Sequence, residues 1–312
     1  MEIVLVMGYP ASGKSTWTAQ HFNGHRRINR DSLGDLTLDQ LCPLVESALD
    51  EGSPVVLDNT YATRESRASV LAVARRRGVP ARCVWLDSTI EQAQYNAVER
   101  LVRTHGRLLS PTEIKQAGRS DPNTYGPAVL FRHRKLFEAP TAAEGFASIE
   151  KVAFQRGAQP GGYTQKALLL DYDGTLRRTK SGDKYPLTPE DVEVLPGRAE
   201  VLKRYAAEGY RLLGVSNQSA VSKGTLSEEG ARRCFARTNE LLGVDIEVAF
   251  CPHDPAPISC WCRKPMPGLG VAFIEKYKLD RAQVVMVGDM TTDRTFAARA
   301  GVRFVDQADF FR

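Results

Sequence analysis

The stretch Ile3-Val-Leu-Val-Met-Gly8-Tyr-Pro-Ala-Ser-Gly13-Lys14-Ser15 decides the fold of the N-terminal half of the chain. Its first five residues are apolar and predict a buried strand, and the glycine-rich loop that follows has the spacing of a nucleoside-triphosphate site. The backbone N–H groups of such a loop bind phosphates, together with the N-terminus of the following helix. We expect Lys14 to reach the β- and γ-phosphates of ATP and Ser15 to ligate Mg²⁺. The residues expected to hold the nucleotide are Gly8, Gly13, Lys14, Ser15 and Thr16.

The rest of the chain alternates short apolar segments with helical patterns. This alternation is typical of parallel sheets that carry helices on both faces. A stretch rich in glycine and uncharged polar residues, 156–165, separates two such series. We therefore predict an α/β protein with two doubly wound parallel-sheet domains, residues 1–157 and 166–312, joined by a linker at 158–165.

The composition is that of a soluble globular protein, with 42% hydrophobic and 25% charged residues in a chain of 312. No apolar run is long enough to cross a bilayer and the N-terminus lacks a signal peptide, so we expect a cytoplasmic protein without a membrane partner. The net charge of +5 is spread over both halves and gives little information about a polyanionic partner. Three of the six cysteines cluster beside a histidine, which in a reducing compartment indicates a metal site.

Two acids follow the strands predicted beside the glycine-rich loop. Asp31 comes at the end of the second strand, where doubly wound sheets place their ligands. An alcohol that attacks a phosphate must lose its proton, and a carboxylate there would be its general base. The alternative is that Asp31 caps a helix that begins at Ser32. Asp58, after Val-Val-Leu, is typical of an acid beside the substrate and the Mg²⁺ shell, although it too could be a cap.

A basic stretch lies between residues 100 and 135. It contains two acids, and Tyr125, Phe131 and two histidines are interleaved with its basic residues. The stretch could line a groove for a nucleic-acid strand, through phosphate pairing and base stacking. Alternatively it is a solvated helical face whose arginines serve only ATP. The basic residues are Arg100, Arg103, Arg107, Lys115, Arg119, Arg132, Arg134 and Lys135.

The N-terminal motifs resemble the kinase module of the phage and bacterial polynucleotide kinase–phosphatase family. The matching segments are 8–17, Ile28-Asn-Arg-Asp31 and Asp58-Asn-Thr60. The resemblance implies that Asp31 is the general base for a 5′-hydroxyl. It also implies a lid in residues 96–107 that closes over ATP, with Arg100 as the first candidate and Arg103 as the second. The phage pattern has an arginine where this chain has Gly34, so Arg64 or Arg67 would have to contact the acceptor phosphate.

The second half begins with Leu168-Leu-Leu170 followed by Asp171-Tyr-Asp173-Gly-Thr175. Two carboxylates one residue apart at a strand end can perform different steps. Asp171 would attack phosphorus to form an acyl-phosphate, and Asp173 would protonate the leaving alcohol and then activate water. Mg²⁺ would offset the repulsion between Asp171 and the phosphate.

This motif resembles the haloacid-dehalogenase-type phosphatases, whose other functional residues occur in the expected order. The resemblance implies that Ser216 and Asn217 contact the phosphoryl group with Thr175, and that Lys264 supplies a positive charge. It implies that Asp289 joins Asp171 and Asp173 as a Mg²⁺ ligand, with Asp293 as a second acid. A strand-end Asp or Ser alone could be a helix cap, but four such residues in order make that reading improbable.

Four soft ligands, Cys251, His253, Cys260 and Cys262, lie within twelve residues. Their spacing suits a closed tetrahedral Zn²⁺ site that orders its loop; the alternative is reduced, unligated thiols. The loop resembles that of histidinol-phosphate and heptose-bisphosphate phosphatases, which implies a structural metal and a substrate-facing Arg263 and Lys264. The phage enzyme lacks this loop.

The leading interpretation is a bifunctional enzyme that heals broken DNA or RNA ends. It would use ATP to phosphorylate 5′-hydroxyl ends and would remove 3′-phosphates, leaving ends for a ligase. The alternative is a bifunctional kinase and phosphatase of sugars or sugar phosphates, which the zinc loop favours. Asp31 with its preceding Asn-Arg and the basic stretch oppose it. A binding module with degenerate sites is a third possibility, and the intact Lys14, Asp171 and Lys264 oppose that.

Overall fold

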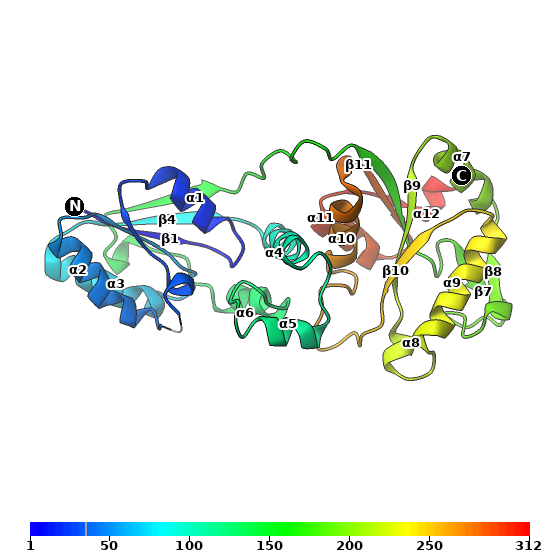
Figure 1. Cartoon of the computed structure of the whole chain (residues 1–312), viewed down its shortest axis with the longest axis horizontal. Helices are drawn as coiled ribbons and strands as arrows, with labels where there is room; N and C mark the ends of the chain where they lie inside the picture. The colour runs from blue at the N-terminus through cyan, green and yellow to red at the C-terminus, as the bar shows by residue number, and fades with distance from the viewer. Residues whose placement is uncertain (35) are drawn as a thin grey trace. The chain divides into compact units, whose positions relative to one another are not determined.

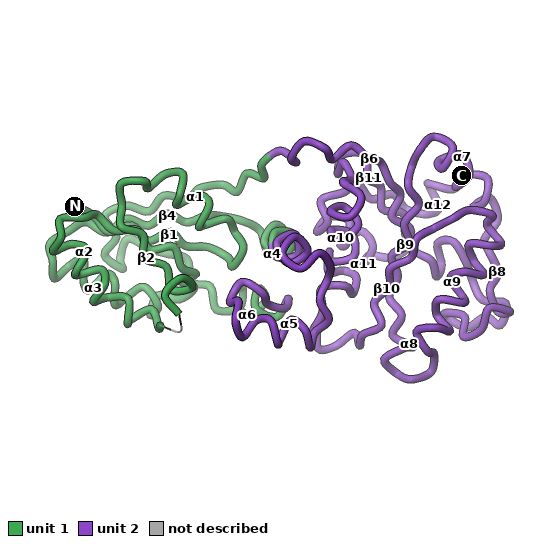
Figure 2. Tube along the Cα trace, in the orientation of Figure 1, with its two compact units in different colours: residues 1–96, 128–157 green, residues 97–127, 158–312 purple. Residues whose placement is uncertain are grey.

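The computed structural model describes residues 1–34 and 36–312 and divides into two compact units (Figure 2). Unit 1 comprises Met1–Asn96 and Ala128–Gly157, and unit 2 comprises Ala97–Pro127 and Ala158–Arg312. The predicted boundary at 157/158 coincides with a boundary between the units. Residues 97–127, which the sequence placed in the first domain, cluster instead with the second. No helix in the described ranges is both long and apolar enough to cross a membrane.

Unit 1 is built on a five-stranded sheet in which every pairing is parallel. The strands, in sheet order, are β2 (Arg26–Ile28), β3 (Val55–Asp58), β1 (Ile3–Met7), β4 (Ala81–Asp87) and β5 (Ser148–Ala153). The helices that contribute to the unit are α1 (Lys14–His21), α2 (Cys42–Asp50), α3 (Arg64–Arg77), the first half of α4 (Ile90–His105) and α6 (Ala128–Leu136).

The side chains of β1 alternate between two apolar layers, as the pleat of a strand requires. Ile3, Leu5 and Met7 pack into a cluster that includes residues of α2 and α3. Val4 and Val6 face a second cluster, which includes Trp17 of α1. Figure 1 shows α1 and the pair α2 and α3 on opposite faces of the strands. This sandwich fixes the end of β1, and therefore the loop at Gly8.

Unit 2 contains a second five-stranded parallel sheet and a short antiparallel hairpin. The strands, in sheet order, are β10 (Glu247–Cys251), β9 (Arg211–Asn217), β6 (Gln165–Leu170), β11 (Leu279–Gly288) and β12 (Arg303–Asp306), and the hairpin pairs β7 (Arg177–Thr179) with β8 (Val192–Val194). The helices are the second half of α4, α5 (Pro111–Ala117), α7 (Arg198–Ala207), α8 (Ser219–Ser222), α9 (Glu228–Leu242), α10 (Gly268–Tyr277), α11 (Thr291–Ala300) and α12 (Gln307–Phe310).

The prediction of two parallel-sheet α/β domains is confirmed. In unit 2, α7 and α9 contribute to an apolar cluster with β6, whereas α10 and α11 contact β11 (Figure 1). Because β6 lies at the centre with β9 and β11 on either side, the carboxyl ends of these three strands meet at one edge. Ligands of doubly wound sheets bind at that edge.

Candidate active sites

The glycine-rich loop of unit 1 has the backbone geometry of a phosphate cradle. Gly8 has φ +148°, and a Cβ atom there would lie 2.8 Å from the carbonyl oxygen of Leu86, so only glycine fits. Lys14 is 9% exposed, and its Nζ donates to the carbonyl oxygens of Gly8 (3.2 Å) and Tyr9 (2.7 Å). The ammonium group therefore lies across the loop, while Ser15 and Thr16 are exposed in the first turn of α1.

A buried histidine packs behind this loop. His133 of α6 is 6% exposed, and its ring contacts Tyr9 with a centroid distance of 4.6 Å. Burial, followed by the charge of Lys14, lowers the pKa of His133 to about 4. The ring is therefore neutral at physiological pH and does not repel the lysine. In the sequence His133 is only one of two histidines interleaved with the basic residues of 100–135, and no local pattern singles it out.

Asp58 is held by an ion pair at the end of β3. Its carboxylate accepts hydrogen bonds from Arg27 (2.7 and 3.1 Å) and from Asn29 Nδ2 (2.9 Å), and its side chain is fully buried. Both oxygens are thus engaged by β2 and the turn that follows it. The structure therefore shows Asp58 fixing the segment that leads to Asp31, and the predicted contact with substrate does not fit this engagement.

Asp31 lies in a 3₁₀ turn, Arg30–Ser32, directly after β2. Its side chain is 40% exposed, and Arg30 Nε is 3.9 Å from its carboxylate. The cap of this turn is Asn29, whose Oδ1 accepts from the Ser32 N–H (3.3 Å), so the alternative reading of Asp31 as the helix cap is wrong. The carboxylate is accessible to a substrate, as a general base requires.

The prediction that Arg67 contacts an acceptor phosphate is contradicted. Its side chain is 0% exposed, and its guanidinium forms a two-point ion pair with Glu144 (2.7 and 3.0 Å). The same group also donates to the carbonyl oxygens of Tyr61 and Glu138, at 3.0 Å each. Arg67 therefore ties α3 to the segment before β5. Arg64 is exposed in the first turn of α3 and stays a candidate for the substrate contact.

The two arginines predicted to close over ATP lie on the half of α4 that belongs to unit 2. Arg103 is engaged there: its guanidinium donates to Glu275 (3.1 Å) and to the Tyr163 hydroxyl (3.3 Å). The hydrogen bond to Glu275 is the main cause of the raised pKa of Arg103. This network contradicts the prediction for Arg103. Arg100 donates to the Asn123 carbonyl (2.8 Å), and its role toward ATP stays a prediction.

Four of the groups that the resemblance implied for unit 2 lie close together. The carboxylates of Asp171, Asp289 and Asp293 each offer an oxygen within 4.8 Å of the others. Lys264 Nζ lies 2.5 Å from Asp171 and 2.7 Å from Asp293, and its side chain is 3% exposed. Three oxygen ligands in this arrangement suit a hard cation such as Mg²⁺.

Burial controls the charges in this group. Desolvation raises the pKa of Asp171 to about 7, with Lys264 acting in the opposite direction. Burial and then the neighbouring Asp293 raise the pKa of Asp289. Burial disfavours the Lys264 ammonium, but the charges of Asp171 and Asp293 raise its pKa overall. Crowded carboxylates that share one lysine need a further cation to be ionised together.

Gly174 and Thr175 shape the floor of the site. A Cβ atom on Gly174 would lie 2.3 Å from Asp289 Oδ2, so glycine is needed for the close approach of that carboxylate. Thr175 is fully buried, and its Oγ1 lies 3.5 Å from oxygens of Asp171 and of Asp289. The hydroxyl of Thr175 can therefore donate to one of these two carboxylates, which is a positioning role rather than the predicted contact with substrate.

The carboxylate of Asp173 is not part of the three-carboxylate group. It accepts from Arg177 Nε (2.8 Å) and from Gln218 Nε2 (3.1 Å). The prediction that this carboxylate ligates Mg²⁺ is therefore contradicted, whereas its predicted acid and base role is compatible with its 21% exposure. No role for Arg177 or Gln218 was predicted from the sequence. Two features of the sequence could have pointed to them. Arg177 lies four residues after Asp173, and Gln218 directly follows Ser216-Asn217.

Ser216 and Asn217, at the end of β9, have different hydrogen-bond partners. Ser216 is 1% exposed, and its Oγ accepts from Gln218 (2.9 Å) at the cavity floor. Asn217 uses both ends of its amide on the main chain of Lys264, at 3.0 and 2.9 Å. Asn217 thus orients Lys264, and its predicted contact with substrate does not fit these bonds.

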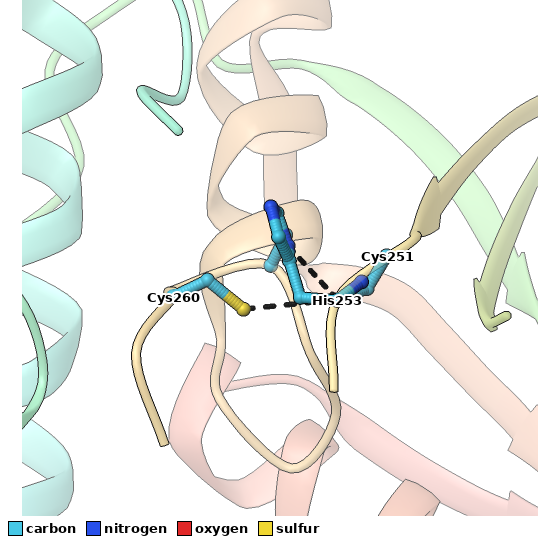
Figure 3. Close-up of side chains that lie close together, drawn as sticks. Cys251, His253 and Cys260 are labelled. Atoms are coloured by element: carbon cyan, nitrogen blue, oxygen red, sulfur yellow. Dashed lines mark hydrogen bonds between the residues drawn. The ribbon is translucent and has the colours of Figure 1, made fainter. Parts of the chain in front are cut away.

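Cys251, His253, Cys260 and Cys262 converge, with ligand atoms within 4.8 Å of one another. Figure 3 shows the first three around one point; the Sγ atoms of Cys251 and Cys260 are 3.7 Å apart, and His253 Nδ1 is 3.2 Å from Cys262 Sγ. Hydrogen bonds from the other two thiols lower the pKa of Cys260. Three sulfurs and one nitrogen at such distances are the donor set of a tetrahedral Zn²⁺ site.

The loop that carries these four residues, 251–262, also contacts Arg263 and the basic stretch. Arg263 donates to the His253 carbonyl (3.0 Å) and lies 3.4 Å from Ser219 Oγ, beside Lys264. Trp261 is 1% exposed, and its indole N–H donates to the Tyr125 carbonyl (2.9 Å). The loop thus connects the phosphatase site with residues 97–127 inside unit 2.

Comparisons with known proteins agree with the two sites. Residues 3–113 match the model of the AAA domain, and residues 261–305 match that of the HAD-hydrolase-like family. A probable D-glycero-D-manno-heptose-1,7-bisphosphate 7-phosphatase of Thermoplasma volcanium is 34% identical over 144 residues, which are 45% of this chain and 96% of that protein. The chain belongs to this phosphatase family. It carries a P-loop kinase domain in front of the HAD-like phosphatase domain.

Other similar proteins include a bifunctional polynucleotide phosphatase/kinase of Schizosaccharomyces pombe, 32% identical over 157 residues. That match covers 49% of this chain but only 34% of the relative. Among solved structures, the heptose-bisphosphate phosphatase of B. bronchiseptica with magnesium and phosphate is 27% identical, with a TM-score of 0.41 over 45% of this chain and 79% of that one. A chain of the Pnkp1/Rnl/Hen1 RNA repair complex aligns over 98% of this chain and 96% of its own, at 16% identity and a TM-score of 0.33.

Proposed function

We propose that this kinase and phosphatase heals broken DNA or RNA ends. Its P-loop unit transfers the γ-phosphoryl group of ATP to a 5′-hydroxyl, and its HAD-like unit removes a 3′-phosphate. The observation that carries the proposal is an accessible Asp31, which follows β2 in the sheet whose strand β1 leads into the glycine-rich loop, in the same chain as the buried group of Asp171 and Lys264. A ligase that seals the product ends is the partner that we propose downstream.

In unit 1 the acceptor is an alcohol, and Asp31 provides its base. The hydroxyl oxygen attacks the γ-phosphorus, its proton passes to Asp31, and ADP leaves. Lys14, which lies across the glycine loop, offsets the negative charge that develops on the phosphoryl oxygens. Mg²⁺ would bind beside Ser15 with the phosphates of ATP. Arg64 and Arg100 are the cations that we propose for the acceptor phosphate and for ATP.

In unit 2 the reaction has two steps. Asp171 attacks phosphorus and the bond to the ester oxygen breaks, while Asp173 gives its proton to the departing 3′-hydroxyl. Water then attacks the acyl-phosphate as Asp173 takes back a proton, and inorganic phosphate leaves. Arg177 and Gln218 hold Asp173 on the side of the leaving group. Lys264 and, from the turn at β9, Ser216 would contact the phosphoryl oxygens.

Two metals fit the residues present. Mg²⁺ held by Asp171 and Asp289, with Asp293 behind Lys264, would neutralise the phosphate before attack. Zn²⁺ held by the three cysteines and His253 is proposed as a structural ion, because a closed set of four protein ligands leaves no position for substrate. Its effect would be to order the loop that carries Arg263 and Lys264.

A second candidate function is the dephosphorylation of a sugar bisphosphate. The 34% identity over nearly the whole length of a heptose-bisphosphate phosphatase favours it. The P-loop unit and Asp31 are not explained by that activity alone. The two functions differ in substrate. The first acts on the 5′-hydroxyl and the 3′-phosphate of a polynucleotide, and the second acts on the phosphate ester of a free sugar.

The test is a substrate panel on the full chain. Labelled ATP is offered with 5′-hydroxyl oligonucleotides and with free sugars, and phosphate release is measured from 3′-phosphorylated oligonucleotides and from heptose bisphosphate. The proposal predicts label on oligonucleotide 5′ ends and phosphate release from oligonucleotide 3′ ends. Label on sugars alone, or release from the sugar bisphosphate alone, would contradict it.

A further inference from the structure

A cavity of about 970 Å³ opens beside Asp171 in unit 2. Its floor is formed by the catalytic side chains, and its outer walls come from residues 183–187 of the β7–β8 hairpin, 254–259 of the zinc loop, and the turn after β11. Sites for drug-sized ligands occupy roughly 300–1,000 Å³, so this volume exceeds what one phosphate group fills. The walls must therefore contact the part of the substrate that carries the phosphate.

The outer wall is unusually apolar for an exposed surface. Leu187, Ile258 and Met290 are 45%, 42% and 49% exposed, and all three line the cavity from three different segments. Nine large hydrophobic side chains are exposed among the described residues, and a third of them gather here. Tyr185 adds a half-buried aromatic ring to the same wall. Gathered apolar groups on a monomer surface mark a binding site rather than chance exposure.

The chemistry of this wall distinguishes a nucleobase from a sugar. A base presents flat π-faces that stack on aromatic and aliphatic side chains, worth about 1–3 kcal/mol per base. A sugar presents hydroxyl groups, and those that face the apolar side chains lose water without gaining a partner. The apolar wall therefore favours a substrate with a base attached to the phosphorylated sugar.

Two lysines at the cavity indicate a second anionic group. Lys184 and Lys223 line it, both are exposed, and within the described ranges neither pairs with a carboxylate. The nearby acids have other partners: Asp254 accepts from Ser222 (2.7 Å) and Asp183 from Ser181 (3.3 Å). Under the proposed function the scissile phosphate would face Lys264 and Arg263, which line the same cavity. Lys184 and Lys223 are thus available for another phosphate, as in the neighbouring phosphodiester of a strand.

We propose that this outer wall is a nucleotide subsite of the phosphatase. The base of the 3′-terminal nucleotide packs on Tyr185, Leu187 and Ile258, and the phosphodiester before it pairs with Lys184 and Lys223. This inference rests on the proposed 3′-phosphatase function and names what that site recognises. The smallest good substrate is then a 3′-phosphorylated dinucleotide, since a mononucleotide lacks the second phosphate.

The base contact is tested with a single change at the wall. Tyr185→Ala should raise KM for a 3′-phosphorylated oligonucleotide about tenfold, as loss of one stacking contact requires, while kcat stays near the wild-type value. The same variant should act normally on a 3′-phosphorylated strand whose terminal sugar is abasic. Leu241→Ala, which also truncates an exposed apolar side chain but on α9, is the matched control. Melting temperatures of both variants exclude unfolding as the cause.

The phosphate contact is tested with Lys184→Ala combined with Lys223→Ala. The double variant should lose the preference of the wild type for a dinucleotide over a mononucleotide, and its KM should depend less on salt. Lys203→Ala, which removes a lysine of unit 2 outside the cavity, is the control.

The outcomes separate the inference from the function beneath it. If the wild type releases phosphate from oligonucleotides but Tyr185→Ala affects base-containing and abasic substrates equally, the subsite is wrong and the function stands. If the double lysine variant keeps the wild-type preference for a dinucleotide, the proposed contact of Lys184 and Lys223 with the phosphodiester is wrong. If the wild type acts on heptose bisphosphate and not on oligonucleotides, both proposals fall together.

Discussion

The two sites of this chain hold their charges in opposite ways. In unit 2, Asp171, Asp289, Asp293 and Lys264 are packed together before any substrate arrives, and Lys264 and Asp293 are almost fully buried. In unit 1, the phosphate cradle is made of backbone, and the carboxylate that would act as base, Asp31, is 40% exposed. A nucleophile that bonds covalently to phosphorus needs a fixed position, whereas a base has only to meet a hydroxyl that the substrate brings.

The two units thus depend on different structural features for their chemistry. The phosphatase unit depends on buried charge pairs, which are costly to break. The kinase unit depends on loop geometry and on one lysine that folds over the loop. Variants should therefore separate the two activities cleanly, and the sizes of their effects should follow burial.

The largest effect is expected at the nucleophile. Asp171→Asn removes the attacking carboxylate but keeps the shape of the side chain, so phosphatase activity should fall by at least about 10³-fold. Kinase activity should be unchanged, because Asp171, Asp289, Asp293 and Lys264 all belong to unit 2. Release of phosphate and transfer of label from ATP, measured on the same preparation, check both halves. Parallel loss of both activities in a folded protein would break the two-site comparison.

The next effect is expected at Lys14. Lys14→Ala removes the cation beside the transferring phosphoryl group, which should lower kinase kcat by about 10²- to 10³-fold. Phosphatase activity on a 3′-phosphorylated oligonucleotide serves as the internal control. Retention of kinase activity above a tenth of the wild-type value would mean that the loop does not bind the transferring phosphate.

Acid pH should weaken unit 1 through His133. Burial lowers the pKa of this histidine to about 4, below its ordinary value of 6.5, so the unfolded chain binds the proton more readily than the folded unit. The neutral, buried histidine contributes up to about 3 kcal/mol to the free energy of unfolding of unit 1. This contribution is fully present above about pH 6.5 and is lost as the pH falls toward 4. Thermal melting of the full chain between pH 4 and 7, compared with His133→Leu, measures it. An equal pH dependence in the variant would assign the loss to other groups.

The smallest effect concerns the acid and base of the phosphatase. Gln218→Ala removes one of the two groups that hold Asp173, and kcat should fall about tenfold as the carboxyl loses its orientation. The loss should be larger for an alkyl phosphate than for p-nitrophenyl phosphate, whose leaving group needs little protonation. Equal losses on both substrates would show a structural role only.

The sequence predicted the parts of both sites that local pattern determines. A strand, a glycine loop and a helix are adjacent in the chain, and so are Asp171, Gly174 and Thr175. Ser216, Lys264 and Asp289 were implied by the resemblance to haloacid-dehalogenase-type phosphatases, and Ser216 and Asp289 also lie where two parallel strands, β9 and β11, end at one edge of the sheet.

The errors at the two arginines have one physical cause, which is that an ion pair depends on distant partners. Arg67 pairs with Glu144, 77 residues away, and Arg103 with Glu275, 172 residues away. No local pattern distinguishes such arginines from ones that face a phosphate. For the same reason the grouping of residues 97–127 with unit 2 could not be read from the alternation of strands and helices.

The central claim is that one chain performs opposite phosphoryl chemistry on the two ends of a nucleic acid. The most direct measurement is mass spectrometry of one oligonucleotide with a 5′-hydroxyl and a 3′-phosphate, incubated with the full chain, ATP and Mg²⁺. The account predicts a product with a 5′-phosphate and a 3′-hydroxyl. With Asp171→Asn the product should gain the 5′-phosphate but keep the 3′-phosphate. With Lys14→Ala it should lose the 3′-phosphate but keep the 5′-hydroxyl. An unchanged oligonucleotide, under conditions in which heptose bisphosphate loses its phosphate, would contradict it.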